Sequence, residues 1–192
     1  MFFPLSTLYY PLGQPMPEGT FGHMVELLLK SRLKLHLDAD RLYDEDVNAY
    51  MAGLLVSYID PLYLHWIRRI LAPYDVDLHE AVLGCREDRV QSYWIYKVNA
   101  DDLLMVRGVF QNPPAPEEEH QGELVRLKRY YSAASQFQRR IYGRPTAVGE
   151  VHSKLAGEAE RYLAILSTTR RDYLQFVQQL SPEELNRLQQ GE

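Results

Sequence analysis

The sequence predicts an all-α protein: a helical bundle of about six to seven helices, with a long C-terminal antiparallel helical hairpin and an extended N-terminal arm. Apolar residues recur in steps of three and four over most of the chain, which is the spacing of one buried helix face. The alternation typical of a half-buried strand occurs in one window, residues 32–40, and no second window supplies a partner strand. An extended link near Leu35 is the alternative that this window leaves open.

Residues 1–19 form the expected arm. The segment combines aromatic residues such as Phe2 and Tyr9 with prolines at a density that prevents a regular helix. We expect its apolar side chains to lie in a groove of the fold or on a neighbouring subunit, because exposed aromatic surface promotes aggregation. The start of the chain also lacks the cationic flank and apolar run of a secretory signal, so no export is expected.

An N-terminal helical lobe is expected over residues 20–110. Thr20 is suited to cap a first helix, and an acidic cluster that ends at Asp46 favours the positive end of a second. Asp60, which is followed by proline, starts a short third helix. Asp88, with a glutamine three residues later, is an N-terminal capping signature for a longer helix.

The proline-rich residues 111–116 mark the boundary to the C-terminal part, residues 117–192. Apolar periodicity predicts one helix over 117–142 and a second, continuous helix over 146–180, joined by a Gly-Arg-Pro turn. These two helices form the predicted hairpin. A Ser-Pro-Glu-Glu capping box at 181–184 predicts a last short helix. The lobe and the hairpin are expected to pack together as one domain.

Charge and composition argue against several classes of protein. The formal net charge of −5 lacks the basic excess that drives non-specific nucleic-acid binding. The most apolar stretch, residues 50–71, is interrupted by Asp60-Pro61 and by two arginines, so no membrane span is predicted. A single cysteine, Cys85, leaves no internal disulfide, which favours a reducing compartment and a cytoplasmic location.

The chain carries none of the common catalytic or cofactor motifs. It has no phosphate loop, dinucleotide fingerprint, zinc-protease pair, CxxC or serine-hydrolase elbow. Glu117 and His120 make one Glu-x-x-His pair, whereas a di-metal site needs two. Asp101-Asp102 lacks partner carboxylates at helical spacing, and Cys85 has no base beside it. We therefore expect no cofactor and no metal, and an enzyme is the minority hypothesis.

A run without acidic residues, between Glu123 and Glu150, is the sharpest local anomaly. Its cations alternate with aromatic residues, a combination that binds phosphates and stacks on bases. The candidate anion-binding or partner-binding residues are Arg126, Arg129, Arg139, Arg140 and Arg144. At helical spacing they border an apolar stripe instead of forming one patch, so these cations are expected to face the acidic N-terminal lobe or solvent.

Two functional hypotheses remain. The first is a non-catalytic helical interaction or scaffold protein, with a homodimer among its forms, because the fourteen tyrosines are typical of interfaces. The second is a helical protein that binds a small molecule or an anion, a nucleic acid being the less favoured case. Its pocket would lie between the lobes, and its candidate lining is His65, Trp66 and Trp94. Convergence of the arginines on a concave site with a histidine would favour the second hypothesis.

Overall fold

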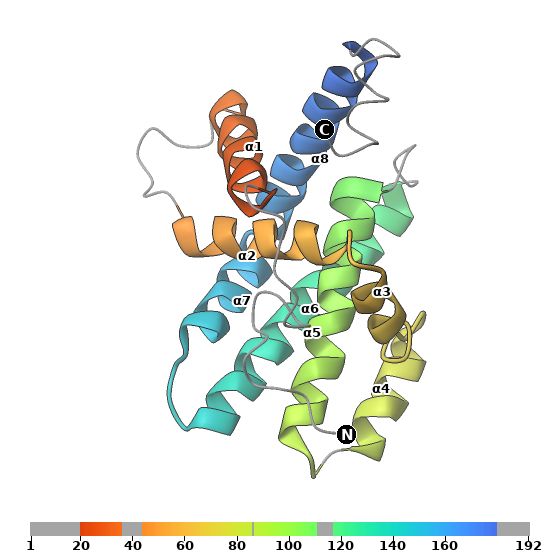
Figure 1. The fold of residues 1–192 in the computed structure, drawn as a ribbon. Helices are drawn as coiled ribbons and strands as arrows, with labels where there is room; N and C mark the ends of the chain where they lie inside the picture. Colours follow the sequence, from red (N-terminus) through yellow and green to blue (C-terminus); the bar gives the residue numbers. More distant parts are fainter. Residues whose placement is uncertain (1–19, 36–43, 86, 111–116, 180–192) are drawn as a thin grey trace.

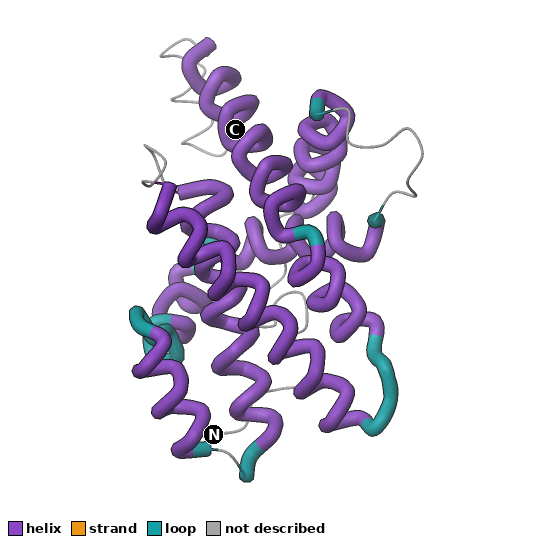
Figure 2. Tube along the Cα trace, turned by 180° about the vertical axis from the view of Figure 1, so that it is seen from behind, coloured by secondary structure: helices purple, strands orange, loops and turns teal. Residues whose placement is uncertain are grey.

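The computed structural model describes residues 20–35, 44–85, 87–110 and 117–179, and within these residues every regular element is a helix (Figures 1 and 2). The elements are α1 (Thr20–Lys34), α2 (Glu45–Ser57), α3 (Pro61–Ile67), α4 (Asp75–Gly84), α5 (Arg89–Met105), the π-helix η1 (Val106–Phe110), α6 (Glu117–Tyr142), α7 (Ala147–Gly157) and α8 (Ala159–Gln179). The prediction of an all-α bundle is confirmed. The arm, the boundary segment 111–116 and the last predicted helix lie outside the described residues.

Local capping explains where several helices begin. The Asp60 carboxylate accepts a hydrogen bond from the Leu62 amide at the start of α3. The Asp88 carboxylate accepts from the amides of Val90 and Gln91 at the start of α5, as its sequence signature predicts. These caps satisfy amides that have no partner inside the helix, and so they fix the first turn.

Asp44 precedes α2 but does not cap it through its side chain. Its carboxylate instead meets groups from three other helices: the Tyr162 hydroxyl at 2.9 Å, Arg32 at 3.5 Å, Lys154 at 3.6 Å and Arg161 at 3.7 Å. Burial raises the pKa of Asp44, but the Tyr162 hydrogen bond and the surrounding cations outweigh it and leave the pKa lowered. The start of α2 is therefore tied to α1, α7 and α8.

The second helix of the predicted hairpin is not continuous, which corrects the expectation for 146–180. α7 ends at Gly157 and α8 begins at Ala159, with Glu158 outside both helices. α7 packs along α6, where the Ser135 hydroxyl donates to the Gly149 carbonyl at 2.7 Å. α8 packs beside α1 and η1 instead (Figures 1 and 2). Glycine is a weak helix former, and a one-residue break leaves the apolar spacing on either side unchanged, so periodicity did not reveal it.

The window 32–40, whose alternating pattern is typical of a strand, begins as helix in the part that the structure describes. Residues 32–34 complete α1, Leu35 follows as a turn, and 36–40 lie outside the described residues. At Ser31, one turn earlier, the Thr169 hydroxyl of α8 donates to the serine hydroxyl at 2.8 Å. The pairing with α8 places this part of the chain in a helix-helix contact and not in a sheet.

The two predicted lobes share one core. Buried apolar residues from both parts form a single cluster, whose largest members include Leu28, Met51, Leu104, Met105, Leu127, Tyr130, Tyr131, Leu155, Tyr162, Ile165 and Leu166. A second cluster joins α3, α5 and α6 through Tyr63, Ile67, Tyr93, Trp94, Val98 and Ala134. The described helices therefore meet around a common interior, with α5 and α6 at its centre.

Candidate functional site

An apolar pocket of about 440 Å³ opens between α1, α2, the α5–η1 region and α8. The described residues that line it are Met24, Leu27, Leu55, Tyr58, Ile59, Met105, Val109, Phe110, Leu166, Thr169 and Arg170. Its volume falls within the range of roughly 300–1,000 Å³ typical of small-molecule sites. Because α8 belongs to the C-terminal part and the other walls to the N-terminal part, the pocket lies between the two predicted lobes.

The pocket has a closed floor and an open mouth. Met105 and Leu166 are almost completely buried, whereas Ile59 and Phe110 are 62% and 56% exposed. Arg170 is half-buried and is the one charged side chain among the described residues of the lining. An apolar molecule that entered from the mouth would cover exposed hydrophobic surface, which is the main favourable term in such binding.

The π-helix η1 shapes one wall. α5 leaves the α-helical path after Met105, and the wider turn of Val106–Phe110 follows. Inside η1, Gly108 lies so close to α8 that an added Cβ would stand 2.6 Å from Cβ of Leu166. Glycine is therefore required here for contact between the two backbones. Single π-turns are often found at functional sites, and this one carries Val109 and Phe110 into the pocket lining.

A buried polar network lies next to the pocket. Tyr58 lines the pocket and donates its hydroxyl hydrogen to Asp102 at 3.0 Å. Burial, and then the charge of neighbouring Asp101, raise the pKa of Asp102 despite the hydrogen bond from Tyr58. Burial likewise raises the pKa of Tyr58 far above its usual range, so its hydroxyl stays a donor.

Asp101 is the centre of this network and is fully buried. One carboxylate oxygen accepts hydrogen bonds from Tyr50 at 2.6 Å and Tyr131 at 2.8 Å, and the other accepts from the Lys97 ammonium at 2.5 Å. Burial and the charge of Asp101 raise the pKa of both tyrosines well above its usual range. The carboxylate therefore joins α2, α5 and α6 through hydrogen bonds to stable donors.

His152 adds α7 to the same network. Its Nε2 atom lies 3.3 Å from the Tyr50 hydroxyl oxygen. Tyr50 has a single hydroxyl hydrogen, which goes to Asp101, so Nε2 must carry the hydrogen of this contact. The ring also stacks on Tyr131 with 5.6 Å between centroids. Burial, and then the charge of Lys97, hold the pKa of His152 well below its usual value, so the imidazole is neutral.

The network lies in the buried interior of the fold and connects four helices. Asp101 and His152 are 0% exposed, and Lys97 is 6% exposed, so no substrate reaches them in this conformation. Sequence reasoning noticed Asp101 only as a candidate metal ligand and missed Tyr50, Lys97, Tyr131 and His152. The available signal was a Lys97–Asp101 pair at i,i+4 spacing in a helix that also carries large apolar residues such as Trp94 and Leu104.

The arginines of α6 do not converge on one site. Asp75 of α4 accepts hydrogen bonds from Arg126, at 3.0 Å, and from Arg129 and Tyr130. Partial burial raises the pKa of Asp75, but these hydrogen bonds and the arginine charges outweigh it and lower the pKa. Two of the five candidate arginines thus face an acidic residue of the N-terminal lobe. Arg139, on α6, and Arg144, in the turn that follows it, are exposed.

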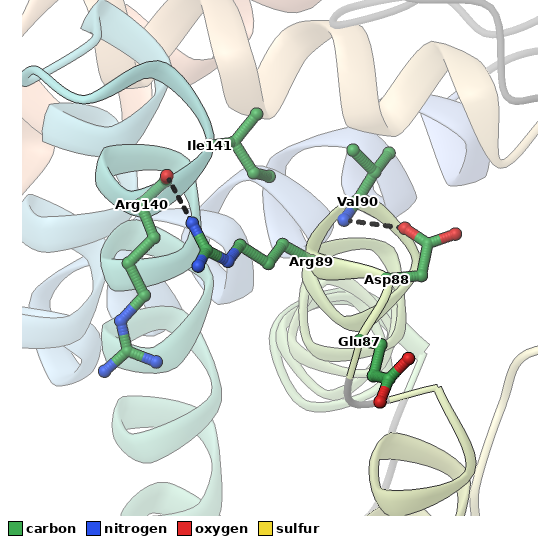
Figure 3. Close-up of a pocket in the computed structure, with 6 residues that line it drawn as sticks. All are labelled: Glu87, Asp88, Arg89, Val90, Arg140 and Ile141. Carbon is green, nitrogen blue, oxygen red and sulfur yellow. Dashed lines mark hydrogen bonds between the residues drawn. The ribbon is translucent and has the colours of Figure 1, made fainter.

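Arg140 lies in the last turn of α6 and borders a shallow, open depression (Figure 3). Glu87, Asp88, Arg89, Val90 and Ile141 complete the lining of this depression. Arg89 donates to the Arg140 backbone carbonyl at 3.3 Å, while the Arg140 guanidinium turns away from Arg89. That guanidinium lies over the Phe137 ring, 5.5 Å from its centroid. The depression mixes both signs of charge and forms no focused anion site.

The three predicted pocket residues, His65, Trp66 and Trp94, lie in two different environments. Trp66 and Trp94 meet edge to face, with 5.6 Å between ring centroids, and Trp94 is buried in the cluster with Tyr63 and Tyr93. His65 lies on the exposed side of α3, where its Nε2 is 3.0 Å from Arg69. None of the three lines the interlobe pocket. Ligand binding by them stays a prediction.

Among the residues that the structure describes, no group of three or more His, Cys, Asp or Glu side chains is placed to hold a metal ion. In the same part of the chain, no helix is both long and apolar enough to cross a bilayer. Cys85 donates through Sγ to the Ala81 carbonyl at 3.2 Å.

No family model, curated protein or solved structure matches this chain.

Proposed function

We propose that this chain is a non-catalytic helical binding protein that takes a small, mainly apolar molecule into the pocket between α1, α2, η1 and α8. The observation that carries the proposal is the interlobe pocket itself, about 440 Å³ in volume, with a buried floor at Met105 and Leu166 and an exposed apolar mouth. A pocket of this size and lining between helices is the usual form of a site for an apolar ligand.

The polar groups near the pocket support binding over catalysis. The hydroxyl of Tyr58 is engaged by Asp102, and the hydroxyl of Thr169 is engaged by Ser31 and by the Ile165 carbonyl. A catalytic site needs a nucleophile or a base within hydrogen-bond reach of the bound molecule. In the described lining, both hydroxyls are instead committed to the fold.

Binding of Nile red, a neutral apolar dye, tests the proposal. The folded protein is expected to bind the dye at one saturable site with a blue-shifted emission. Val109→Trp should fill the pocket and weaken this binding at least about tenfold. The matched control is Val125→Trp, which makes the same change at an exposed position of α6 outside the pocket. Equal dye binding by the two variants would contradict the proposal.

Self-association is the second candidate function, favoured by the exposed face of α4. Val76 and Leu83 lie seven residues apart on this helix, hence on one face, and they are 66% and 51% exposed. Tyr74, just before the helix, is 70% exposed. Light scattering should then show a dimer that Leu83→Asp dissociates. A monomer at all concentrations up to about 100 μM would count against this candidate.

A further inference from the structure

We infer that the molecule bound in the interlobe pocket is aromatic, about two rings in size, and that one of its rings packs against Phe110 at the mouth. This inference rests on the proposed function and specifies its ligand class. The observation that carries it is a row of three aromatic rings, Tyr63, Tyr58 and Phe110, which runs from the buried second cluster to the mouth of the pocket.

The row of rings is closely spaced and ends at an exposed member. The ring centroids of Tyr63 and Tyr58 are 5.6 Å apart, and those of Tyr58 and Phe110 are 5.7 Å apart. Both distances lie within the range of roughly 4.5–7 Å in which aromatic pairs attract one another beyond the burial of area. Tyr63 is 3% exposed, whereas Phe110 is 56% exposed. A ligand ring that packed on Phe110 would continue the row and cover part of this surface.

Tyr58 makes the middle of the row a fixed wall. Its hydroxyl donates to Asp102 at 3.0 Å, and its ring contacts the rings of Tyr63 and Phe110. An aromatic side chain that is already held in this way loses little conformational freedom when a ligand binds, so its contact with the ligand costs little entropy. The pocket therefore offers an aromatic surface that is arranged before binding.

Two methionines add sulfur atoms to the lining. Met105 is 1% exposed at the floor, and Met24 of α1 is half-buried. A thioether sulfur makes favourable contacts with an aromatic ring, often at the ring edge. Most of the other described lining residues are aliphatic and would accept any apolar molecule. The rings and the thioethers are thus the groups that distinguish an aromatic ligand from an aliphatic one.

The volume of the pocket indicates the size of the ligand. An apolar cavity of about 150 Å³ can hold one benzene molecule. The interlobe pocket, at about 440 Å³, is roughly three times as large. It therefore has room for two rings with a short substituent.

Displacement of Nile red by a matched pair of alcohols tests the inference. The probes are naphthaleneethanol and its saturated counterpart decahydronaphthaleneethanol, which share one carbon skeleton and one hydroxyl. Each displacing concentration is corrected for the measured partition of the probe between water and octane, which removes the difference in their hydrophobicity. The corrected concentration should be about threefold to tenfold lower for the aromatic alcohol, the difference expected of ring contacts beyond area burial.

Variants assign the preference to particular side chains. Phe110→Leu should reduce it to less than about twofold, and Met105→Leu, which nearly conserves volume, should reduce it in part. The matched controls are Tyr142→Leu, at an exposed aromatic residue, and Met51→Leu, at a buried methionine; both positions lie outside the described lining. The controls should keep the full preference, and all four variants should keep the helical circular dichroism spectrum.

The outcomes separate the two proposals. Equal corrected displacement by the two alcohols, or tighter binding of the saturated one, would overturn the inference while leaving the apolar pocket in place. An aromatic preference that persists in Phe110→Leu, or is unchanged in Met105→Leu, would overturn the assignment to that side chain. Failure of the wild-type protein to bind Nile red, or undiminished dye binding by Val109→Trp, would instead remove the proposed function itself.

Discussion

Replacing Asp101 by asparagine should destabilise the fold strongly, because it leaves the Lys97 ammonium buried beside a neutral amide. Asp101 is 0% exposed and Lys97 is 6% exposed, and the two groups lie 2.5 Å apart. Removing one partner of such a pair typically costs about 3–5 kcal/mol. The hydroxyls of Tyr50 and Tyr131 still have an amide oxygen to donate to, so the expected loss lies at the lower end, about 3 kcal/mol.

Urea unfolding followed by circular dichroism measures this loss. For a chain of this length, about 3 kcal/mol corresponds to a decrease in Tm of roughly 6–12 °C. The double variant Lys97→Met, Asp101→Asn should recover at least about half of the loss, because it removes the stranded charge. Asp77→Asn, at an exposed position of α4, serves as the control and should change stability by less than about 0.5 kcal/mol. A cost for Asp101→Asn no larger than that of the control would refute the network as a stabilising element.

Three further predictions follow from the same packing. Gly108→Ala should lower the free energy of unfolding by about 1–3 kcal/mol in urea unfolding, because the added Cβ would lie 2.6 Å from Leu166. The control Gly122→Ala has no atom near the added Cβ, so it should be neutral or stabilising by up to about 1 kcal/mol. The reverse order of stabilities would be inconsistent with a close contact between η1 and α8. Because the pKa of His152 is lowered in the folded protein, the unfolded chain binds a proton that the folded chain does not. The free energy of unfolding should therefore fall as the pH drops below about 6.5, by at most about 1.4 kcal/mol per pH unit. His152→Gln should flatten this slope between about pH 5 and 6.5, and an unchanged slope would exclude the histidine as its source. Asp75→Asn should weaken the contact between α4 and α6 and lower the free energy of unfolding by about 1 kcal/mol or less, because the ion pairs that it breaks are partly exposed. Faster amide hydrogen exchange confined to α4 is the expected result. Faster exchange spread uniformly over the chain would argue against it.

Sequence reasoning was most successful where structure depends on near neighbours. The caps at Asp60 and Asp88 act through amides two or three residues away, so their side chains fix these helix starts whatever else the chain does. It was less successful at Glu158 and at η1. There the chain departs from a regular helix because α8 must reach α1, and because Gly108 allows η1 to approach Leu166.

The candidate site was the least predictable part of the molecule. A pocket between the lobes could be expected from the number of helices and their amphipathic faces. The residues that line it could not be predicted in this way. Trp66 and Trp94 are large aromatic residues that suit a pocket as well as a core, and the fold pairs them with each other in the second cluster. The described residues that line the interlobe pocket are mostly apolar and come from four separate segments, and no local pattern marks them.

Local sequence was enough to predict that this protein is helical and where most of its helices begin, because spacing and capping act within a few residues. It did not predict every buried face: Leu33 of α1 is 67% exposed, whereas Ser31 on the same helix is 0% exposed. Tertiary structure alone decided which side chains meet. It brought Tyr50, Asp101, Tyr131 and His152 together from four helices, and it left a cavity where α1, α2, η1 and α8 cross. Such convergence depends on the angles and distances at which helices pack, which are set jointly by contacts between segments far apart in the chain.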